Sequence, residues 1–212
     1  LDAFETLVQI IRQSRPAFCF SFQGIGMDIK DDTGQNLWTG NKVPFLTYLG
    51  DSPYHAPRLH GEEGEGLYLL YSCQDFFEVY KEGMHGRTFA GLIDYNYPFD
   101  LRVENPDWGT RPIKMLYAKT PSNLKKFHEE FDGFPRLIRE AAYESAKQAL
   151  KGPEQTIFHI CRDVLERQNV YMGRHREILF HMCSKVDFYV RAVHAERMVK
   201  ALLPYDALIV GD

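Results

Sequence analysis

The segment 44–60, PFLTYLGDSPYHAPRLH, constrains the fold more than any other stretch of the chain. An apolar run stops there at Gly50. The predicted loop that follows begins with GDSP and contains one aspartate, Asp51, and two histidines, His55 and His60. Residues 16–26, PAFCFSFQGIG, have the same form, with Asp28 just beyond a glycine-rich turn. Two such endings predict neighbouring strands whose carboxyl ends line one cleft, where α/β enzymes present acid and base groups.

Strand patterns alternate with helical patterns along the whole chain. We expect strands at residues 17–22, 43–49, 67–73, 88–92, 113–118 and 207–210, and helices at 2–13, 76–83, 124–150 with a break at Gly133 and Pro135, 156–168 and 175–203. This alternation predicts an α/β fold with an open, mainly parallel, Rossmann-like sheet. A proline- and aromatic-rich stretch in 97–112 breaks the periodicity, so we expect two lobes, residues 1–108 and a helix-rich 109–212.

Composition excludes several classes of protein. The chain is 44% hydrophobic and 25% charged, and no apolar run approaches the roughly 20 residues that a membrane span needs. The net charge is −4 with acids and bases interspersed, so no basic stripe predicts a nucleic-acid partner. The four cysteines are widely spaced without a C-x-x-C pair, which is typical of buried reduced thiols in a cytoplasmic protein.

The two ends of the sequence suggest a longer chain. The first residues already follow a helical pattern and include no initiator methionine. The last strand pattern stops at Gly211-Asp212, and such a strand normally feeds another element. We therefore expect the sequence to be an excerpt.

The loop after residue 49 carries the strongest candidates for chemistry. Asp51 is followed by Ser-Pro, and because proline restricts the backbone, the carboxylate would be held at the strand tip as a general base. The alternative is that Asp51 only caps the Ser-Pro turn. His55 is a second candidate for proton transfer, and Tyr54 and His60 are predicted to contact the substrate. His55 and His60 lack a third ligand at a useful spacing, so we predict no metal site.

Two glycines and one turn are candidates for contacts to substrate and phosphate. Gly24 and Gly26 would let the backbone approach an acceptor substrate closely, although two glycines are too few for a dinucleotide fingerprint. The turn KTPSN would place Lys119 and a helix start at Ser122 and Asn123, with Ser122 as the N-cap, over a diphosphate. The alternative for this turn is a solvated lysine at a strand edge.

Five segments together resemble the middle of bacterial CgeB-like glycosyltransferases, which are similar to GT-B enzymes. They are FSFQGIG, PFLTYLGDSPYHAPRLH, LLYSCQDFFEVYKEG, RPIKMLYAKTPSN and RAVHAERMVKALLPYDALIVGD. In that family a strand ending in Asp-x-Pro, with a nearby histidine, faces the cleft from the N-terminal lobe. The pattern matches Asp51, Pro53 and His55 in this chain.

The resemblance implies transfer of a sugar from a nucleotide diphosphate sugar, as co-substrate, to a hydroxyl acceptor, without another cofactor or an obligatory metal. It also implies that residues of the donor site belong to a later part of the second lobe, which this sequence does not include. A competing hypothesis is a non-catalytic α/β module that binds a glycan or a protein. A phosphate-ester or nucleotide-processing enzyme ranks last, because the chain has no convincing phosphate loop or paired metal carboxylates.

Overall fold

A computed structural model of the protein describes residues 3–84, 88–93, 112–113, 115–119, 123–152, 154–170 and 176–211. The chain divides into two compact units, Leu1–Asn96 and Tyr97–Asp212. The boundary that the sequence predicts, between residues 108 and 109, falls outside the described residues and stays a prediction.

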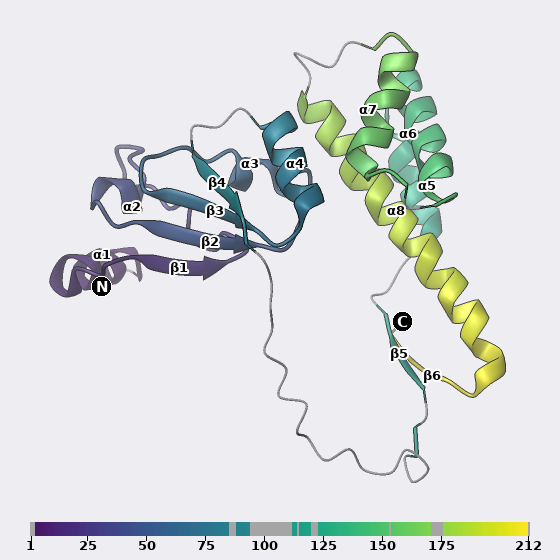
Figure 1. The fold of residues 1–212 in the computed structure, drawn as a ribbon, viewed down its shortest axis with the longest axis horizontal. Helices are drawn as coiled ribbons and strands as arrows, with labels where there is room; N and C mark the ends of the chain where they lie inside the picture. Colours follow the sequence, from purple (N-terminus) through teal and green to yellow (C-terminus); the bar gives the residue numbers. More distant parts are fainter. Residues whose placement is uncertain are drawn as a thin grey trace. The chain divides into compact units, whose positions relative to one another are not determined.

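The first unit contains a parallel four-stranded sheet, which confirms the predicted α/β class. Its strands are β1 (Cys19–Phe22), β2 (Phe45–Leu49), β3 (Leu67–Tyr71) and β4 (Phe89–Leu92). They lie side by side in the order β1-β2-β3-β4, and every neighbouring pair is parallel (Figure 1). The predicted strands are all present in the described residues, and they are shorter than predicted because their ends turn into loops.

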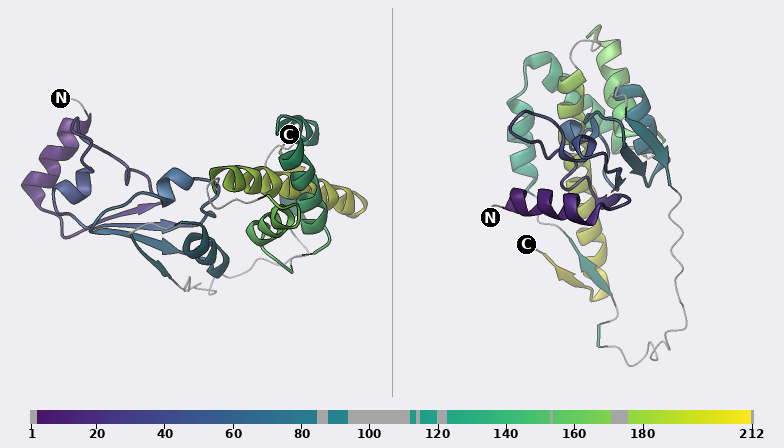
Figure 2. Two further views of the ribbon diagram at one scale, coloured as in Figure 1. Left: turned by 90° about the horizontal axis from the view of Figure 1, so that it is seen from above. Right: turned by 90° about the vertical axis from the view of Figure 1, so that its left-hand side faces the viewer.

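The helices of the first unit pack on one face of this sheet (Figure 2). They are α1 (Ala3–Ser14), α2 (Leu37–Gly40), α3 (Pro57–His60) and α4 (Gln74–Gly83). Alternate side chains of β2 and β3 are buried, since successive residues of a strand point to opposite faces. The buried cluster on this face consists of Ile11, Met27, Leu37, Trp38, Val43, Phe45, Leu49, Leu67, Leu69, Tyr71 and Tyr80.

The second unit is built mainly from helices. Its strands β5 (Leu116–Ala118) and β6 (Leu208–Val210) pair in parallel. Between them the chain forms α5 (Leu124–Asp132), α6 (Arg136–Ala149), α7 (Ile157–Arg167), α8 (Arg176–Leu202) and the 3₁₀ turn η2 (Leu203–Tyr205). The predicted break at Gly133 and Pro135 is confirmed, because the chain leaves α5 and enters α6 there. Three small residues of α6, Ala141, Ala142 and Ala146, are buried among the helices.

The cysteines agree with the sequence-based expectation only in part. Cys161 and Cys183 are buried, whereas Cys19 and Cys73 are half-buried, and all four are free thiols. Cys19 is more exposed than predicted because β1 is an edge strand of the sheet. No helix in the described part of the chain is long and apolar enough to cross a bilayer.

Candidate functional site

The carboxyl ends of β1, β2 and β3 meet at one edge of the four-stranded sheet. Gln23 follows β1, and its backbone N–H donates to the Tyr48 carbonyl oxygen at 2.8 Å. Its side-chain oxygen Oε1 accepts from the backbone N–H of Gly50 at 3.1 Å. Ser72, which follows β3, donates through its backbone N–H to the Leu49 carbonyl oxygen at 3.3 Å. These bonds join the three strand ends, as the sequence pattern predicts for a parallel sheet.

The turn after β1 is built by residues with left-handed backbone geometry. Gln23 has a φ of 54° and Gly24 a φ of 68°, and the Ile25 N–H donates to the Phe22 carbonyl oxygen at 3.2 Å. Positive φ at both central positions is the signature of a type I′ turn. A Cβ atom on Gly24 would lie 2.7 Å from Leu59 Cγ. Packing against Leu59 therefore explains this glycine without a ligand.

A backbone group of each of the two glycines predicted to contact the substrate is hydrogen-bonded within the protein. The Gly24 N–H donates to Thr47 Oγ1 at 2.7 Å in a buried position, so this donor is already used within the protein. Gly26 has a φ of 82°, and its carbonyl oxygen accepts from Trp38 Nε1 at 2.6 Å. Both glycines shape the turn, and their contact with an acceptor stays a prediction.

Asp51 is exposed at the tip of β2, where the sequence places it. The next residue, Ser52, is fully buried, and Pro53 and Tyr54 are buried as well. The backbone N–H of His55 donates to the Ser52 carbonyl oxygen at 2.9 Å, which closes the turn. The exposed carboxylate thus stands on a backbone whose following residues are fixed in the protein interior.

Ser52 is a polar side chain that sequence reasoning missed. Its Oγ atom is buried and finds no hydrogen-bond partner within the described part of the chain. A buried hydroxyl without a partner costs on the order of 1–3 kcal/mol. The signal in the sequence was its position, directly after the candidate base and before a proline.

Two further residues of this edge, Gln23 and Thr47, were also missed. Thr47 is the one polar residue in the β2 run FLTYL, and it is fully buried. A hydroxyl at a core-facing position of a strand needs a partner, and Thr47 accepts from the Gly24 N–H in the neighbouring turn. This position in the alternation is the signal that could have identified it.

Tyr54 and His55 lie next to each other in the loop after β2. Their rings are in an edge-to-face arrangement with centroids 4.7 Å apart. Tyr54 is 7% exposed, whereas His55 is half-buried. His55 is therefore the more accessible of the two beside Asp51.

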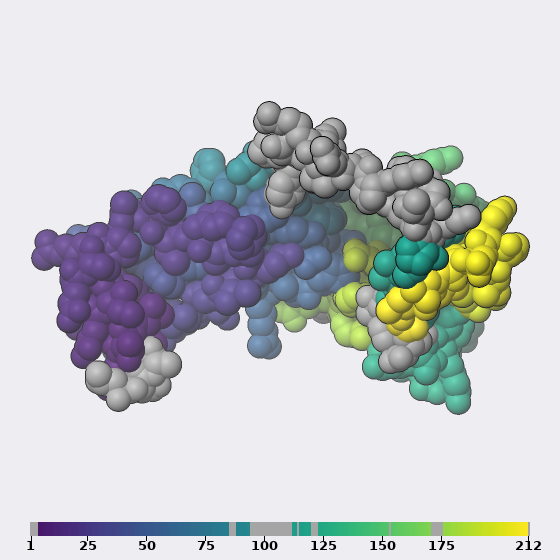
Figure 3. Space-filling model, turned by 90° about the horizontal axis from the view of Figure 1, so that it is seen from below, coloured from purple at the N-terminus to yellow at the C-terminus, as the bar shows by residue number. Residues whose placement is uncertain are grey.

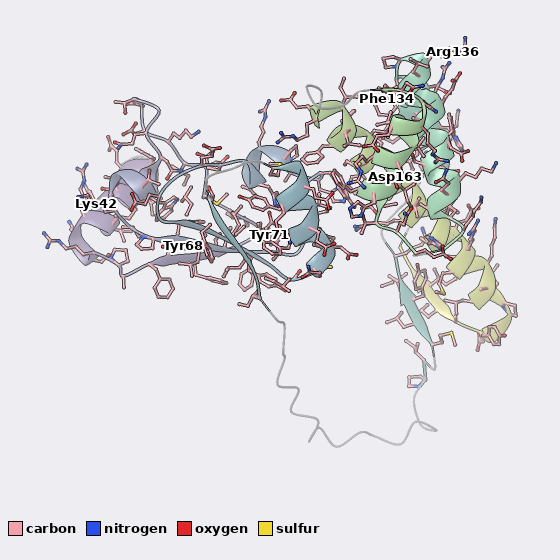
Figure 4. All side chains as sticks on the ribbon, turned by 45° about the horizontal axis from the view of Figure 1, so that its top comes forward. Lys42, Tyr68, Tyr71, Phe134, Arg136 and Asp163 are labelled. Carbon is pink, nitrogen blue, oxygen red and sulfur yellow. The ribbon has the colours of Figure 1, made fainter. Side chains whose placement is uncertain are left out.

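His60 is buried and is not a loop residue, which corrects the predicted placement. It ends α3, it is 1% exposed, and its Nδ1 lies 2.7 Å from the Tyr71 hydroxyl oxygen (Tyr71 is labelled in Figure 4). The two rings stack with centroids 5.6 Å apart. Burial, with a smaller effect of His55, lowers the pKa of His60 to about 4. His60 is thus a neutral core side chain, and direct contact with a substrate would require it to move.

In the second unit, Lys119 and Asn123 stand on either side of residues 120–122. The Lys119 backbone N–H donates to the Val210 carbonyl oxygen at 2.9 Å at the end of β5. Asn123 caps α5, because its side-chain oxygen accepts from the Lys126 N–H at 3.3 Å. The sequence predicted Ser122 as the cap, so this assignment is corrected to Asn123. Ser122 itself lies outside the described residues.

Gly211 follows β6 directly beside Lys119. It has a φ of 122°, and a Cβ atom there would clash with the Lys119 carbonyl oxygen. The chain can approach Lys119 this closely because glycine has no side chain. No group of three or more His, Cys, Asp or Glu residues that could hold a metal ion is present in the part of the chain that the structure describes.

Comparisons with known proteins give one partial match. No protein-family model matches the chain, and no solved structure matches it. A proline–tRNA ligase of Thermofilum pendens is 27% identical over 114 residues. The matched part covers 52% of this chain and 23% of the ligase, so the chain spans less than a quarter of that relative's length. This likeness assigns no family.

Proposed function

We propose that this chain is a glycosyltransferase, or a fragment of one, that transfers a sugar from a nucleotide diphosphate sugar to a hydroxyl acceptor. The observation that carries the proposal is the exposed Asp51 carboxylate at the carboxyl end of β2. Its turn is anchored on one side by the Gly50–Gln23 hydrogen bond and on the other by buried Ser52. A general base must be held in a fixed position and be open to its substrate.

The chemistry assigned to this edge is proton removal from the acceptor. Asp51 would take the proton of the acceptor hydroxyl as its oxygen bonds to the anomeric carbon of the sugar. The bond between that carbon and the diphosphate oxygen then breaks, and the diphosphate leaves with the electron pair. His55, half-buried beside Asp51, is the second candidate for proton transfer. The unpartnered Ser52 hydroxyl supports a ligand site at this edge, because a polar ligand there would relieve its desolvation.

The donor side is assigned to the second unit. Lys119 supplies a positive charge after β5, and Asn123 caps the nine-residue helix α5. A lysine and a helix N-terminus both favour the negative charge of a departing diphosphate. We assign Ser122 to the same role from the sequence motif. No cofactor besides the nucleotide sugar is part of the proposal.

The family and cellular setting of the proposal come from the sequence. The resemblance to CgeB-like enzymes suggests a bacterial GT-B protein, and free cysteines are typical of the cytoplasm. The activity of the proline–tRNA ligase is not transferred to this chain, since less than a quarter of that protein is matched.

The test is an assay for release of nucleoside diphosphate from a panel of nucleotide sugars in the presence of mixed sugar acceptors. We expect turnover by the intact enzyme and a loss of about 100-fold or more in its Asp51→Asn variant. Asp32→Asn is the matched control, because Asp32 is also an exposed loop aspartate of the first unit. Both variants should melt at the temperature of the parent protein.

Two results would contradict the proposal. Turnover that survives Asp51→Asn removes Asp51 from the mechanism. Binding of a glycan without any dependence on nucleotide, and without turnover for any donor, would favour the non-catalytic binding module.

A further inference from the structure

The side chain of Gln23 joins the ends of β1 and β2. Its Oε1 accepts from the Gly50 N–H at 3.1 Å, and Gly50 directly precedes Asp51. A backbone N–H can only donate, so this bond fixes which end of the amide group faces Gly50. Within the described part of the chain, this is the hydrogen bond that the Gln23 side chain makes, and it uses the oxygen. The two N–H groups of Nε2 are therefore left as donors for water or a ligand.

The amide nitrogen of Gln23 lies over Gly50, one residue away from the candidate base. A Cβ atom on Gly50 would stand 3.1 Å from Nε2, which is closer than side chains normally pack. Glycine at this position therefore leaves the room that the amide occupies. Since consecutive Cα atoms are about 3.8 Å apart, Nε2 lies less than about 9 Å from the Cα atom of Asp51.

Both side chains are at the surface of the first unit. Gln23 and Asp51 are exposed, and the purple part of the chain, to which the turn after β1 belongs, lies at the surface in the view of Figure 3. One small ligand can reach Nε2 and the carboxylate together, because each hydrogen bond adds about 3 Å to its span.

Gln23 has an unusual backbone geometry for a residue with a long side chain. Its φ of 54° lies in the left-handed region, where glycine and asparagine are common. The turn does not require glutamine, because glycine would adopt this backbone without the steric cost. Glutamine adds an amide that reaches Gly50 and places Nε2 near Asp51. The side chain, rather than the turn, is thus the feature to explain.

The charges at this edge favour a neutral ligand. Residues 23–28 and 49–55 contain two aspartates, Asp28 and Asp51, and they include no lysine or arginine. A phosphate or carboxylate would therefore meet charges of its own sign. A hydroxyl group can both donate to the Asp51 carboxylate and accept from Nε2 of Gln23. Two neighbouring hydroxyl groups, as on a sugar ring, make both bonds at once.

We propose that Gln23 binds the acceptor substrate, and that this substrate carries neighbouring hydroxyl groups, as a sugar does. Nε2 of Gln23 donates to one hydroxyl oxygen while the adjacent hydroxyl donates to Asp51. Gln23 thereby selects and orients the ring whose proton Asp51 removes. An alcohol with a single hydroxyl leaves one of the two protein groups without its bond. This inference rests on the proposed function, because it takes the ligand of this edge to be the acceptor.

The test measures binding of neutral sugars to the 212-residue chain in the absence of any nucleotide sugar. The probes are the methyl glycosides of glucose, galactose, mannose and N-acetylglucosamine, added up to about 100 mM because few contacts give millimolar binding. In proton–nitrogen correlation spectra, we expect at least one glycoside to shift the Gln23 side-chain amide signals and the Gly50 and Asp51 backbone signals. Propanol, with a single hydroxyl, should bind about 10-fold more weakly.

Gln23→Glu is the decisive variant. Glutamate keeps an oxygen that can accept from the Gly50 N–H, and it removes both donors of Nε2. It should weaken glycoside binding about 10-fold, the effect of one hydrogen bond, as measured by the Gly50 and Asp51 signals. Gln9→Glu is the matched control, because Gln9 is an exposed glutamine on α1 and the change adds the same charge. Gln23→Gly suits the left-handed backbone, removes the whole side chain and should weaken binding as much.

Two results would overturn the inference. The first is the absence of any shift with all of the glycosides. The second is binding that Gln23→Glu and Gln23→Gly leave unchanged, which would mean that Gln23 only joins the two turns.

Turnover separates this inference from the proposed function. Glycoside binding that depends on Gln23, in a protein that turns over no donor, would support this site and contradict the glycosyltransferase. Turnover that Asp51→Asn abolishes, with an acceptor KM that Gln23→Glu leaves unchanged, would support the enzyme and contradict the role of Gln23.

Discussion

The two parallel sheets of this protein differ in how their side chains are buried. In the four-stranded sheet, Phe45 and Leu67 are 1% exposed, and Leu69 is fully buried. In the two-stranded sheet, Leu116 is 59% exposed and Leu208 is 45% exposed. Both pairings have regular parallel register, so backbone geometry alone does not distinguish them.

The difference shows that the two units are stabilised by different elements. The first unit has its core on one face of the sheet, where β2 and β3 supply five of the eleven residues of the buried cluster. In the second unit the buried residues belong to the helices, among them Phe131, Leu165 and Met182. A pair of strands is marginally stable without packing, so β5 and β6 depend on the helices that connect them.

Truncating one leucine in each sheet should give the largest difference in unfolding free energy between the two sheets. Leu69→Ala removes a fully buried side chain and should lower the free energy of unfolding of the first unit by about 3 kcal/mol. Leu208→Ala removes an exposed side chain and should cost less than about 1 kcal/mol. Urea unfolding measures both losses. Trp38 fluorescence in a Trp108→Phe background reports on the first unit, and circular dichroism reports on the helices of the second unit. Equal losses would contradict the comparison.

The second effect concerns acid stability and should appear in the first unit. The pKa of His60 is lowered to about 4 in the folded protein, against 6.5 for an unperturbed histidine. The unfolded chain therefore binds a proton first as the pH falls, so stability that is present above pH 6.5 is lost progressively between about pH 6.5 and pH 4. The difference corresponds to roughly 3 kcal/mol as an upper figure.

Urea titrations at several pH values measure this loss. In His60→Gln the decline of stability of the first unit between pH 6.5 and 4 should be smaller than in the parent protein. His181→Gln in the second unit serves as the control and should leave the decline unchanged. A parent protein whose first unit is equally stable at both pH values would show that His60 is open to protonation when folded.

The positions of the strands were predictable from particular residues, whereas the face of the sheet on which the helices pack was not. The apolar run that stops at Gly50 predicted β2 and the run 67–73 predicted β3, because such runs have the length and the endings of buried strands. That the helices of the first unit all pack on one face could not be predicted, since it depends on the spatial order of the strands, which no local pattern encodes.

The candidate site was predictable where it depends on strand ends. Asp51 stands at the exposed tip of β2, as its place after an apolar run indicates. His60 was misplaced because its loop continues into the short helix α3, which turns the ring towards Tyr71. The cap of α5 was misplaced by one residue, since serine and asparagine are both good caps and stand next to each other.

A smaller effect should follow from removing the one buried hydroxyl of β2. Thr47→Val keeps the shape of the side chain and deletes the acceptor of the Gly24 N–H. The buried N–H then lacks a partner, and the first unit should lose about 1–2 kcal/mol of unfolding free energy. Thr39→Val is the control, because Thr39 is half-buried and donates over a longer 3.3 Å bond. If both variants are equally stable, the turn after β1 does not depend on Thr47.

The last comparison separates the two asparagine caps, one in each unit, and includes the smallest expected effect, that of Asn123. Asn36 is 7% exposed, its side-chain oxygen accepts from the N–H groups of Trp38 and Thr39, and its Nδ2 donates to the Met27 carbonyl oxygen at 2.8 Å. Asn123 is exposed, and its side-chain oxygen accepts from the Lys126 N–H. Asn36→Ala should cost about 2 kcal/mol and Asn123→Ala about 0.5 kcal/mol, at the two ends of the range for caps.

Urea unfolding with the same two probes measures the effect of each cap. The controls replace each asparagine by serine, because serine caps helices almost as well. Asn36→Ser should recover only part of the stability, since serine cannot also reach the Met27 carbonyl oxygen. Asn123→Ser should recover nearly all of it, since serine can accept the exposed bond from the Lys126 N–H as well. A larger loss at Asn123 than at Asn36 would mean that α5 depends on its first turn more than on its packing, and the contrast between the two units would fail.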